Sequence, residues 1–495
     1  MAGLFFLALF TAYISVKPND MQNEFSRPNI IYILADDLGY GDIKVLNDQS
    51  KIESPNIDRI AHEGILFTDA HSASSVCTPS RYALLTGRYA WRSILKRNVL
   101  LGVDPALIES NRATVASFLK ENGYHTAVVG KWHLGLDWVK KDASKPLYDG
   151  TNKWAVERTN IDYLQPVTNG PRTLGFDYSY IIPSSLDIMP YLYLENNIAV
   201  EPADSFTEGK SQTTFGRGIH WLPGEMSAGF VFEEVMPTFT RQAISYIHKR
   251  ASIGEPFFLF FAMSAPHTPW LPTSTHSGQS GAGHYGDFVQ QVDSSVGQIL
   301  GALDEAGISD ETLIIFTSDN GAHWTEKDKS KFDHRANGLL RGQKADIYEG
   351  GHRVPFLVRW PGHISSGTRS MQTISLSDLF ATLAELLGEE IPQGAAEDSI
   401  SIMPALLSRS SDRREATIHH SLDGMFAIRK GDWKLIEGLG SGGFTSPSRI
   451  KQIKGGSKGQ LYNLAIDPAE LVNLYESQPT MVAELESLLA MYRES

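Results

Sequence analysis

Short apolar runs that alternate with amphipathic segments constrain the fold of this chain more than any other feature. The apolar runs cover residues 29–35, 126–130, 256–263 and 312–317. Their near-continuous apolar character is typical of strands buried on both faces. Residues 114–121 and 287–304 have helical spacing, and the first of these ends at Asn122-Gly123, a helix-stop signal. Strands that alternate with helices predict an α/β domain with a largely parallel sheet.

The rest of the chain indicates loops around this sheet and a smaller domain after it. Residues 137–223 are rich in Tyr, Trp, Pro and Asn and lack long periodicity, so we expect long loops with short elements that line a site. A helix over 378–387 ends at Gly388. Short strand-like runs and an amphipathic helix follow, at residues 426–429, 433–437 and 481–492.

A chain of 495 residues favours more than one domain. We expect a large domain over residues 26–405 and a C-terminal α+β subdomain over 406–495. Within the latter, residues 439–459 are rich in Gly and Ser with several Lys and Arg. This composition is typical of a solvated loop, to which the sequence assigns no function.

The N-terminus carries an apolar run at residues 4–16. The run is too short for a transmembrane helix and suits the core of a signal peptide. It lacks a preceding basic residue and a clear cleavage site, so residues 1–25 are either a signal peptide or an apolar tail. No later segment resembles a membrane span. We therefore expect a secreted or periplasmic protein without a membrane-spanning segment.

Charge and cysteine content exclude several classes of function. The formal net charge is −13, so the surface as a whole repels nucleic acid and we expect no nucleic-acid partner. An anionic ligand must then be held by local cations or by a metal. The single cysteine, Cys77, excludes an internal disulfide framework and a thiolate-rich zinc site. Cys77 is therefore either an inert buried thiol or a chemical centre.

Acidic side chains follow two of the predicted strands. Asp36 and Asp37 follow the first run, and Asp319 and Asn320 follow the run at 312–317. Either pair alone could be an ordinary solvated turn. Because ligands of α/β sheets gather at the carboxyl ends of strands, we expect the four side chains to converge. An all-oxygen set suits a hard cation such as Ca²⁺, and without a cation the carboxylates would repel one another.

Cys77 has polar neighbours, although a lone cysteine is most often a small buried hydrophobic residue. Pro79-Ser80 can start a helix, whose N-terminal N–H groups would favour an anion. Arg81 adds a planar cation beside it.

Four further basic residues lie near predicted strand ends or tight turns. Lys131 and His133 follow directly on the second strand, and extended alternation would place both on one side of the chain. His267 follows the third strand between two prolines that stiffen the backbone, which suits a positioned acid or base. Lys344 precedes a Glu-Gly-Gly turn. A surface lysine or a packed histidine is the alternative for each.

Two motifs resemble the signatures of a known family, the type I, formylglycine-dependent sulfatases. Residues 77–87 match C-x-P-S-R-x-x-x-L-T-G, and residues 123–133 match G-Y-x5-G-K-x-H. The resemblance extends from about residue 29 to residue 464. It implies an alkaline-phosphatase-like fold, with a central, mostly parallel sheet between helices and a smaller C-terminal α+β domain. It also implies an arylsulfatase-like sulfuric ester hydrolase.

The resemblance implies a chemical role for each candidate residue. In this family a formylglycine-generating enzyme oxidises the motif cysteine to Cα-formylglycine, and a hydroxyl of the aldehyde hydrate attacks sulfur. Ca²⁺ would be held by Asp36, Asp37, Asp319, Asn320 and residue 77. Lys131 and Lys344 would bind sulfate, His267 would protonate the leaving oxygen, His133 would assist release of sulfate, and Arg81 would orient the hydrate.

Local segments at 91–93, 185–187 and 267–270 are similar to bacterial exo-sulfatases. They imply a sulfated carbohydrate or small sulfate ester as substrate, with 6-sulfated galactose or N-acetylgalactosamine as candidates. Asp187, His220 and Trp270 are candidate sugar contacts, although each could instead pack within a loop. Two alternatives stay open at this point: a phosphatase or phosphonate hydrolase of the same superfold, and an unmodified carbohydrate-binding relative.

Overall fold

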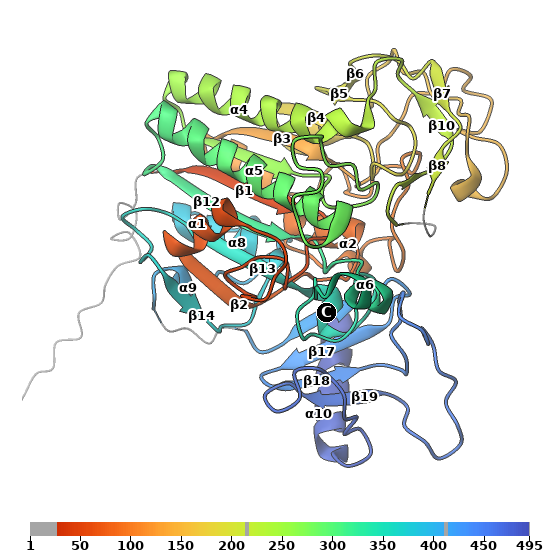
Figure 1. Cartoon of the computed structure of the whole chain (residues 1–495), viewed down its shortest axis with the longest axis vertical. Helices are drawn as coiled ribbons and strands as arrows, with labels where there is room; N and C mark the ends of the chain where they lie inside the picture. The colour runs from red at the N-terminus through yellow and green to blue at the C-terminus, as the bar shows by residue number, and fades with distance from the viewer. Residues whose placement is uncertain (1–26, 213–216, 410–413, 495) are drawn as a thin grey trace, which may run out of the picture.

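The computed structural model describes residues 27–212, 217–409 and 414–494 (Figure 1). The segment expected to be a signal peptide or tail, residues 1–25, lies outside these ranges. Among the described residues, no helix combines the length and apolar character needed to cross a membrane.

The described large domain is built on an eleven-stranded sheet with the order β14-β2-β13-β12-β1-β11-β3-β4-β5-β6, and β15 pairs with β2. β1, β11, β12, β3 and β4 are parallel neighbours, whereas β13 runs antiparallel to β12 and β2. The α/β prediction is confirmed. The strands are β1 (Asn29–Ala35), β2 (Ile65–His71), β3 (His125–Lys131), β4 (Tyr178–Ile182), β5 (Leu194–Glu195), β6 (Ile198–Ala199), β11 (Phe257–Ala262), β12 (Thr312–Ser318), β13 (Arg353–Arg359), β14 (Thr368–Ser370) and β15 (Ile374–Ser375).

The central strands of the sheet are buried along their whole length, because helices cover the sheet. α4 and α5 lie side by side and α1 contacts α5, while α2, α3 and α8 form a second packed group (Figure 1). The α-helices are α1 (Pro55–His62), α2 (Cys77–Thr86), α3 (Val115–Glu121), α4 (Val235–Ile253), α5 (Gly283–Ala306), α6 (Glu326–Phe332), α7 (Glu349–His352), α8 (Leu379–Leu387) and α9 (Met403–Leu406). Short 3-10 turns are η2 (Ala90–Arg92), η3 (Lys153–Ala155), η4 (Pro171–Leu174), η5 (Phe232–Glu234) and η6 (Leu376–Asp378).

The region 137–223 forms long loops with short elements, as expected, but it also supplies β4 to the central sheet. Outside the central sheet this part of the chain carries β7 (Ser205–Thr207), β8 (Lys210–Ser211) and β9 (His220–Trp221), followed by β10 (Gly224–Met226). β4 pairs in parallel with β3 and extends the sheet beyond the strands that the sequence predicted.

A four-stranded antiparallel sheet forms the smaller C-terminal part. It contains β16 (Thr417–His420), β17 (Phe426–Lys430), β18 (Trp433–Ile436) and β19 (Gln460–Asn463), and α10 (Pro479–Glu494) packs on β17 and β18. The expectation of a solvated loop at 439–459 is wrong for its first part. Ser441 is buried and Thr445 donates to Asp346 of the large domain, because this part of the loop folds back against the large domain.

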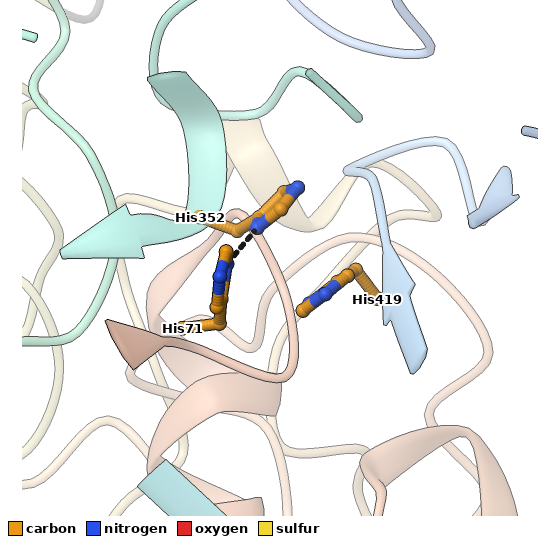
Figure 2. Close-up of side chains that lie close together, drawn as sticks. All are labelled: His71, His352 and His419. Atoms are coloured by element: carbon orange, nitrogen blue, oxygen red, sulfur yellow. Dashed lines mark hydrogen bonds between the residues drawn. The ribbon is translucent and has the colours of Figure 1, made fainter. Parts of the chain in front are cut away.

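Three buried imidazoles join the two sheets (Figure 2). His71 ends β2, His352 ends α7, and His419 lies on β16. The rings of His352 and His419 are stacked 3.9 Å apart with 10° between their planes. Nearly parallel planes keep the in-plane nitrogen lone pairs of these two rings from meeting at one ion, so we interpret the cluster as a hydrogen-bond network.

The contacts of this network define one proton arrangement. His71 Nε2 lies 2.9 Å from Asp69 Oδ1, His71 Nδ1 lies 3.0 Å from His352 Nδ1, and the Lys434 ammonium lies 3.0 Å from His352 Nε2. Since an ammonium can only donate, His352 Nε2 accepts, His352 Nδ1 donates to His71, and His71 Nε2 donates to Asp69. Arg429 Nη1 lies 3.0 Å from His71 Nε2 because both groups donate to the same oxygen, Asp69 Oδ1. Both imidazoles are neutral in this arrangement. Burial lowers the pKa of all three histidines.

Acid should therefore destabilise the folded chain before its carboxylates titrate. The unfolded state protonates histidines near pH 6.5, while the folded state keeps these three neutral, so stability present above pH 6.5 is lost as pH falls toward the lower folded pKa values. Each histidine contributes up to about 1.4 kcal/mol per pH unit to this loss. Urea unfolding at several pH values measures it. His419→Gln should flatten the dependence, and an unchanged dependence in that variant would contradict this account.

Candidate active site

The carboxyl ends of β1 and β12 bring the predicted oxygen ligands together. The two strands are parallel neighbours with Ala35 opposite Ser318, so the residues that follow them meet at one edge. Asn320 Nδ2 donates to Asp37 Oδ1 at 2.7 Å, and the Asp37 N–H donates to Asp319 Oδ1 at 3.3 Å. Asp36, Asp37, Asp319 and Asn320 are all buried.

Cys77 lies against this carboxylate group at the first position of α2. Its Sγ is 3.4 Å from Asp36 Oδ1, and its side chain is 1% exposed. Burial, and after it the charge of Asp36, raises the pKa of the thiol well above its ordinary value. The unmodified side chain is therefore a neutral thiol at physiological pH, and a neutral thiol is a poor nucleophile.

Three buried cations balance the three carboxylates. Arg81, one turn into α2, donates from Nε to Asp319 Oδ2 at 3.0 Å and from Nη1 to the Lys131 carbonyl at 2.7 Å. Lys131 ends β3 and its Nζ contacts Asp36 Oδ2. Lys344 Nζ donates to Asp37 Oδ2 at 2.7 Å. The nearest carboxylate differs for each cation, and Arg81 Nη2 also lies 3.8 Å from Asp36 Oδ2, so three cations face three carboxylates.

These contacts give the three carboxyl groups different pKa values. Burial by itself would raise the pKa of Asp36, but the neighbouring cations, Lys131 first, lower it well below its ordinary value. Burial would likewise raise the pKa of Asp37, but the neighbouring cations, Lys344 first, lower it below its ordinary value. Burial and then the charge of Asp36 raise the pKa of Asp319 to about 7. The repulsion between these carboxylates is the kind that a bound cation relieves.

The donor set fits a hard divalent cation. Asn320 Oδ1 is buried without a hydrogen-bond partner, and an orphaned amide oxygen of this kind is a metal-ligand type. Ligand-type atoms of Asp36, Asp37, Cys77 and His267 lie within 4.8 Å of one another.

The two predicted histidines approach the same cluster. The prediction of extended alternation at Lys131 and His133 is wrong, because His133 adopts a left-handed φ of 57°. This turn lets His133 Nε2 bond the Leu100 carbonyl at 2.8 Å, while its buried Nδ1 has no hydrogen-bond partner. Burial and then Lys131 lower the pKa of His133 well below 6.5, so the ring is neutral and Nδ1 can accept a proton.

His267 lies beside Asp37. Its Nε2 is 3.6 Å from Asp37 Oδ2, and its Nδ1 bonds the Thr268 carbonyl at 2.6 Å. Ser185 Oγ lies 3.1 Å from this ring and 3.2 Å from Lys131 Nζ, and it therefore links the histidine to the lysine. Burial, and after it Lys344, lowers the pKa of His267.

A cavity of about 820 Å³ opens over these groups. It is lined by Cys77, His133, His267 and Lys344 and by two of the candidate sugar contacts, Asp187 and His220. The third candidate, Trp270, is not among the lining residues. Its ring packs 5.3 Å from Tyr285, and the Arg217 guanidinium lies 5.0 Å above it, so its face is already covered.

Several lining residues carry no sequence signal that identified them. Phe444 comes from a loop without a motif, and His323 follows the Asp-Asn pair by three residues. Ser185 lies in the segment 185–187 that the sequence singled out, but only Asp187 of that segment was named as a contact. The position of His323 just beyond a predicted strand tip was the only signal available. Phe444 shows that the C-terminal loop closes one side of the cavity.

Comparison with known proteins agrees with this geometry. Residues 28–389 match the sulfatase family, and residues 343–494 match the C-terminal region described as that of N-sulphoglucosamine sulphohydrolase. A Bacteroides thetaiotaomicron N-acetylgalactosamine-6-O-sulfatase is 33% identical over 98% of this chain and 96% of its own length. Human arylsulfatase A is 32% identical over 90% of this chain and 83% of its own length.

A solved structure is also similar over nearly the full length. It comes from work on the metabolism of multiple glycosaminoglycans by Bacteroides thetaiotaomicron and has a TM-score of 0.80. The similarity covers 95% of this chain and 100% of that one at 33% identity. Because the family match covers most of the residues and the curated relatives are sulfuric ester hydrolases, this chain belongs to the sulfatase family of the alkaline-phosphatase-like fold.

Proposed function

We propose that this sulfatase hydrolyses a sulfated carbohydrate through a Cα-formylglycine formed at Cys77 and with a bound Ca²⁺. The observation that carries the proposal is the contact of residue 77 with Asp36 at the edge where two strand tips converge. The substrate we favour is a 6-sulfated N-acetylgalactosamine or galactose, which the similarity to an N-acetylgalactosamine-6-O-sulfatase supports.

The same proposal extends to maturation and domain organisation. A formylglycine-generating enzyme is the partner that modifies Cys77, in a protein that is secreted or periplasmic. Residues 26–405 form the catalytic domain and 406–495 the C-terminal subdomain.

Ca²⁺ would be held by Asp36, Asp37, Asp319, Asn320 and residue 77. When bound, it supplies positive charge that polarises the sulfate and lowers the pKa of an adjacent hydroxyl. Lys131 and Lys344, both buried and both beside the carboxylates, would bind sulfate oxygens and offset the charge on the transferring group. Arg81 would fix Asp319 and the start of α2.

Proton transfer falls to the two histidines. Attack by a hydroxyl at residue 77 forms an oxygen–sulfur bond and breaks the bond from sulfur to the sugar oxygen, which needs a proton. His267 would donate that proton from Nε2 in its doubly protonated form, with Nδ1–H held by the Thr268 carbonyl and the charge of the ring offset by Asp37. The neutral His133, whose Nδ1 has no partner, would accept the proton of the second hydroxyl at residue 77 as sulfate leaves and the aldehyde reforms.

The test of this function compares p-nitrophenyl sulfate with p-nitrophenyl phosphate, using enzyme produced together with a formylglycine-generating enzyme. We expect hydrolysis of the sulfate to exceed that of the phosphate by orders of magnitude. Chelation should abolish activity and added calcium should restore it. A preference for phosphate would establish the phosphatase alternative, and activity that is indifferent to chelation would refute the metal assignment.

A further inference from the structure

A second groove lies where η2, β17 and α10 meet, outside the catalytic cavity. Its volume is about 660 Å³. Two acidic residues line it, Asp423 and Glu494, against five basic residues: Arg88, Arg92, Lys96, Arg97 and Arg493. In a chain whose net charge is −13, this excess of positive charge opposes the overall field.

Among the described residues, two of these cations have no acidic partner. Arg88, Arg92 and Arg493 each form an ion pair, with Glu397, Asp398 and Glu437 respectively. Lys96 Nζ donates only to the Trp91 carbonyl, at 2.6 Å. Arg97 makes no hydrogen bond or ion pair within the part of the chain that the structure describes, and both side chains are exposed. Their charges are therefore available to an anionic ligand.

One residue that lines the groove, Trp91, also carries a neutral donor without a partner among the described residues. Trp91 is 7% exposed, and its buried Nε1 has no hydrogen-bond partner among the described residues. The ring is held by the Arg92 guanidinium 4.5 Å above it and by Phe426 at 5.6 Å edge-on. A buried N–H without an acceptor costs free energy that an oxygen of a ligand would recover.

Consecutive residues of the chain line this groove and the catalytic cavity. Asn98 and Leu422 line the cavity, while their neighbours Arg97 and Asp423 line the groove. The Asn98 N–H donates to the Leu422 carbonyl at 2.8 Å and joins the two segments. A ligand that extends out of the cavity past these two segments would meet Lys96 and Arg97 next.

We propose that the groove binds a second anionic group of the same sulfated carbohydrate chain whose terminal sulfated sugar occupies the catalytic cavity. This inference rests on the proposed function. Lys96 and Arg97 bind the sulfate or carboxylate oxygens of a neighbouring sugar, and a guanidinium can do so through two parallel hydrogen bonds. Trp91 Nε1 donates to a further oxygen. The enzyme thereby distinguishes an oligosaccharide from a single sulfated sugar.

The test compares N-acetylgalactosamine 6-sulfate with chondroitin 6-sulfate oligosaccharides as substrates of the Lys96→Gln/Arg97→Gln double variant. For the oligosaccharides we expect kcat/KM to fall about 10- to 100-fold, mainly through KM, since two charged hydrogen bonds are lost. For the monosaccharide and for p-nitrophenyl sulfate, kcat/KM should stay unchanged. Lys249→Gln, which removes an exposed charge on α4, is the matched control and should affect neither.

Equal kcat/KM values for oligosaccharide in wild type and double variant would overturn the inference, and so would a parallel loss on the monosaccharide. Calorimetric binding of the oligosaccharides to Cys77→Ala enzyme, with and without the groove substitutions, separates this result from the proposed function. If the groove substitutions weaken oligosaccharide binding, the groove is a binding site. This conclusion holds even if wild-type enzyme fails to hydrolyse aryl sulfates. Should the double variant misfold by circular dichroism, Arg97→Gln alone repeats the comparison.

Discussion

Cys77→Ala is expected to lower kcat on p-nitrophenyl sulfate by at least about 10⁴-fold, the scale on which loss of a covalent nucleophile acts. The side chain is buried beside Asp36, and its loss removes a single small group from a packed site. The free energy of unfolding should therefore change little. Activity and stability respond differently because residue 77 supplies the nucleophile but contributes little to packing.

Two comparisons make this prediction specific to an aldehyde. Wild-type protein produced without the modifying enzyme keeps the thiol, whose pKa is raised by burial and by Asp36, and it should be as inactive as Cys77→Ala. Cys77→Ser supplies a hydroxyl but lacks the second hydroxyl needed to expel sulfate, so we expect at most one turnover and a stable sulfate ester. Mass spectrometry of the peptide that contains residue 77 identifies each state.

An intact thiol in protein produced together with the modifying enzyme would contradict the proposal. So would full activity of the unmodified protein. An intact thiol would support the alternative of an unmodified carbohydrate-binding protein. Such a protein would bind oligosaccharides without hydrolysing them.

The strand tips were predictable because their signal is local. A run of buried residues followed by Asp-Asp or Asp-Asn identifies a strand and the polar edge where it ends, and parallel pairing of β1 with β12 then brings the side chains together. The two motifs supplied Arg81 and Lys131 in the same way. The ion-pair partners of these residues were not predictable, since Arg81 meets Asp319 across 238 positions of sequence.

The parts that sequence reasoning missed depend on contacts between distant loops. β4 has five residues within an aromatic-rich stretch, and its pairing with β3 becomes evident only once the sheet exists. The left-handed backbone at His133 replaces the extended alternation that a strand pattern suggests. Lys96 and Arg97 resemble ordinary surface charges until β17 and α10 bring Phe426 and Arg493 to the same groove.

The largest effect on stability is expected at Lys434, which lies at the junction of the two sheets. Its side chain is fully buried, and its Nζ lies 3.1 Å from Glu349 Oε1 and 2.9 Å from Glu470 Oε1. The same ammonium donates to His352 of the imidazole cluster. Lys434→Met keeps most of the aliphatic volume but removes the ammonium that these groups share. We expect the free energy of unfolding to fall by about 3–5 kcal/mol, the cost of leaving a buried charge uncompensated.

The double variant Lys434→Met/Glu470→Gln distinguishes this electrostatic account from lost packing. Glu349 keeps Arg353, whose Nε lies 2.8 Å from Glu349 Oε2, whereas Glu470 keeps only the Glu349 N–H at 2.7 Å as a charge-stabilising donor to its carboxylate. Neutralising Glu470 together with Lys434 should therefore recover part of the loss, as measured by urea unfolding at pH 7. Lys430→Met on the neighbouring strand, which removes an exposed lysine, is the control and should be neutral. A double variant no more stable than Lys434→Met would show that packing, and not the unpaired carboxylate, determines the cost.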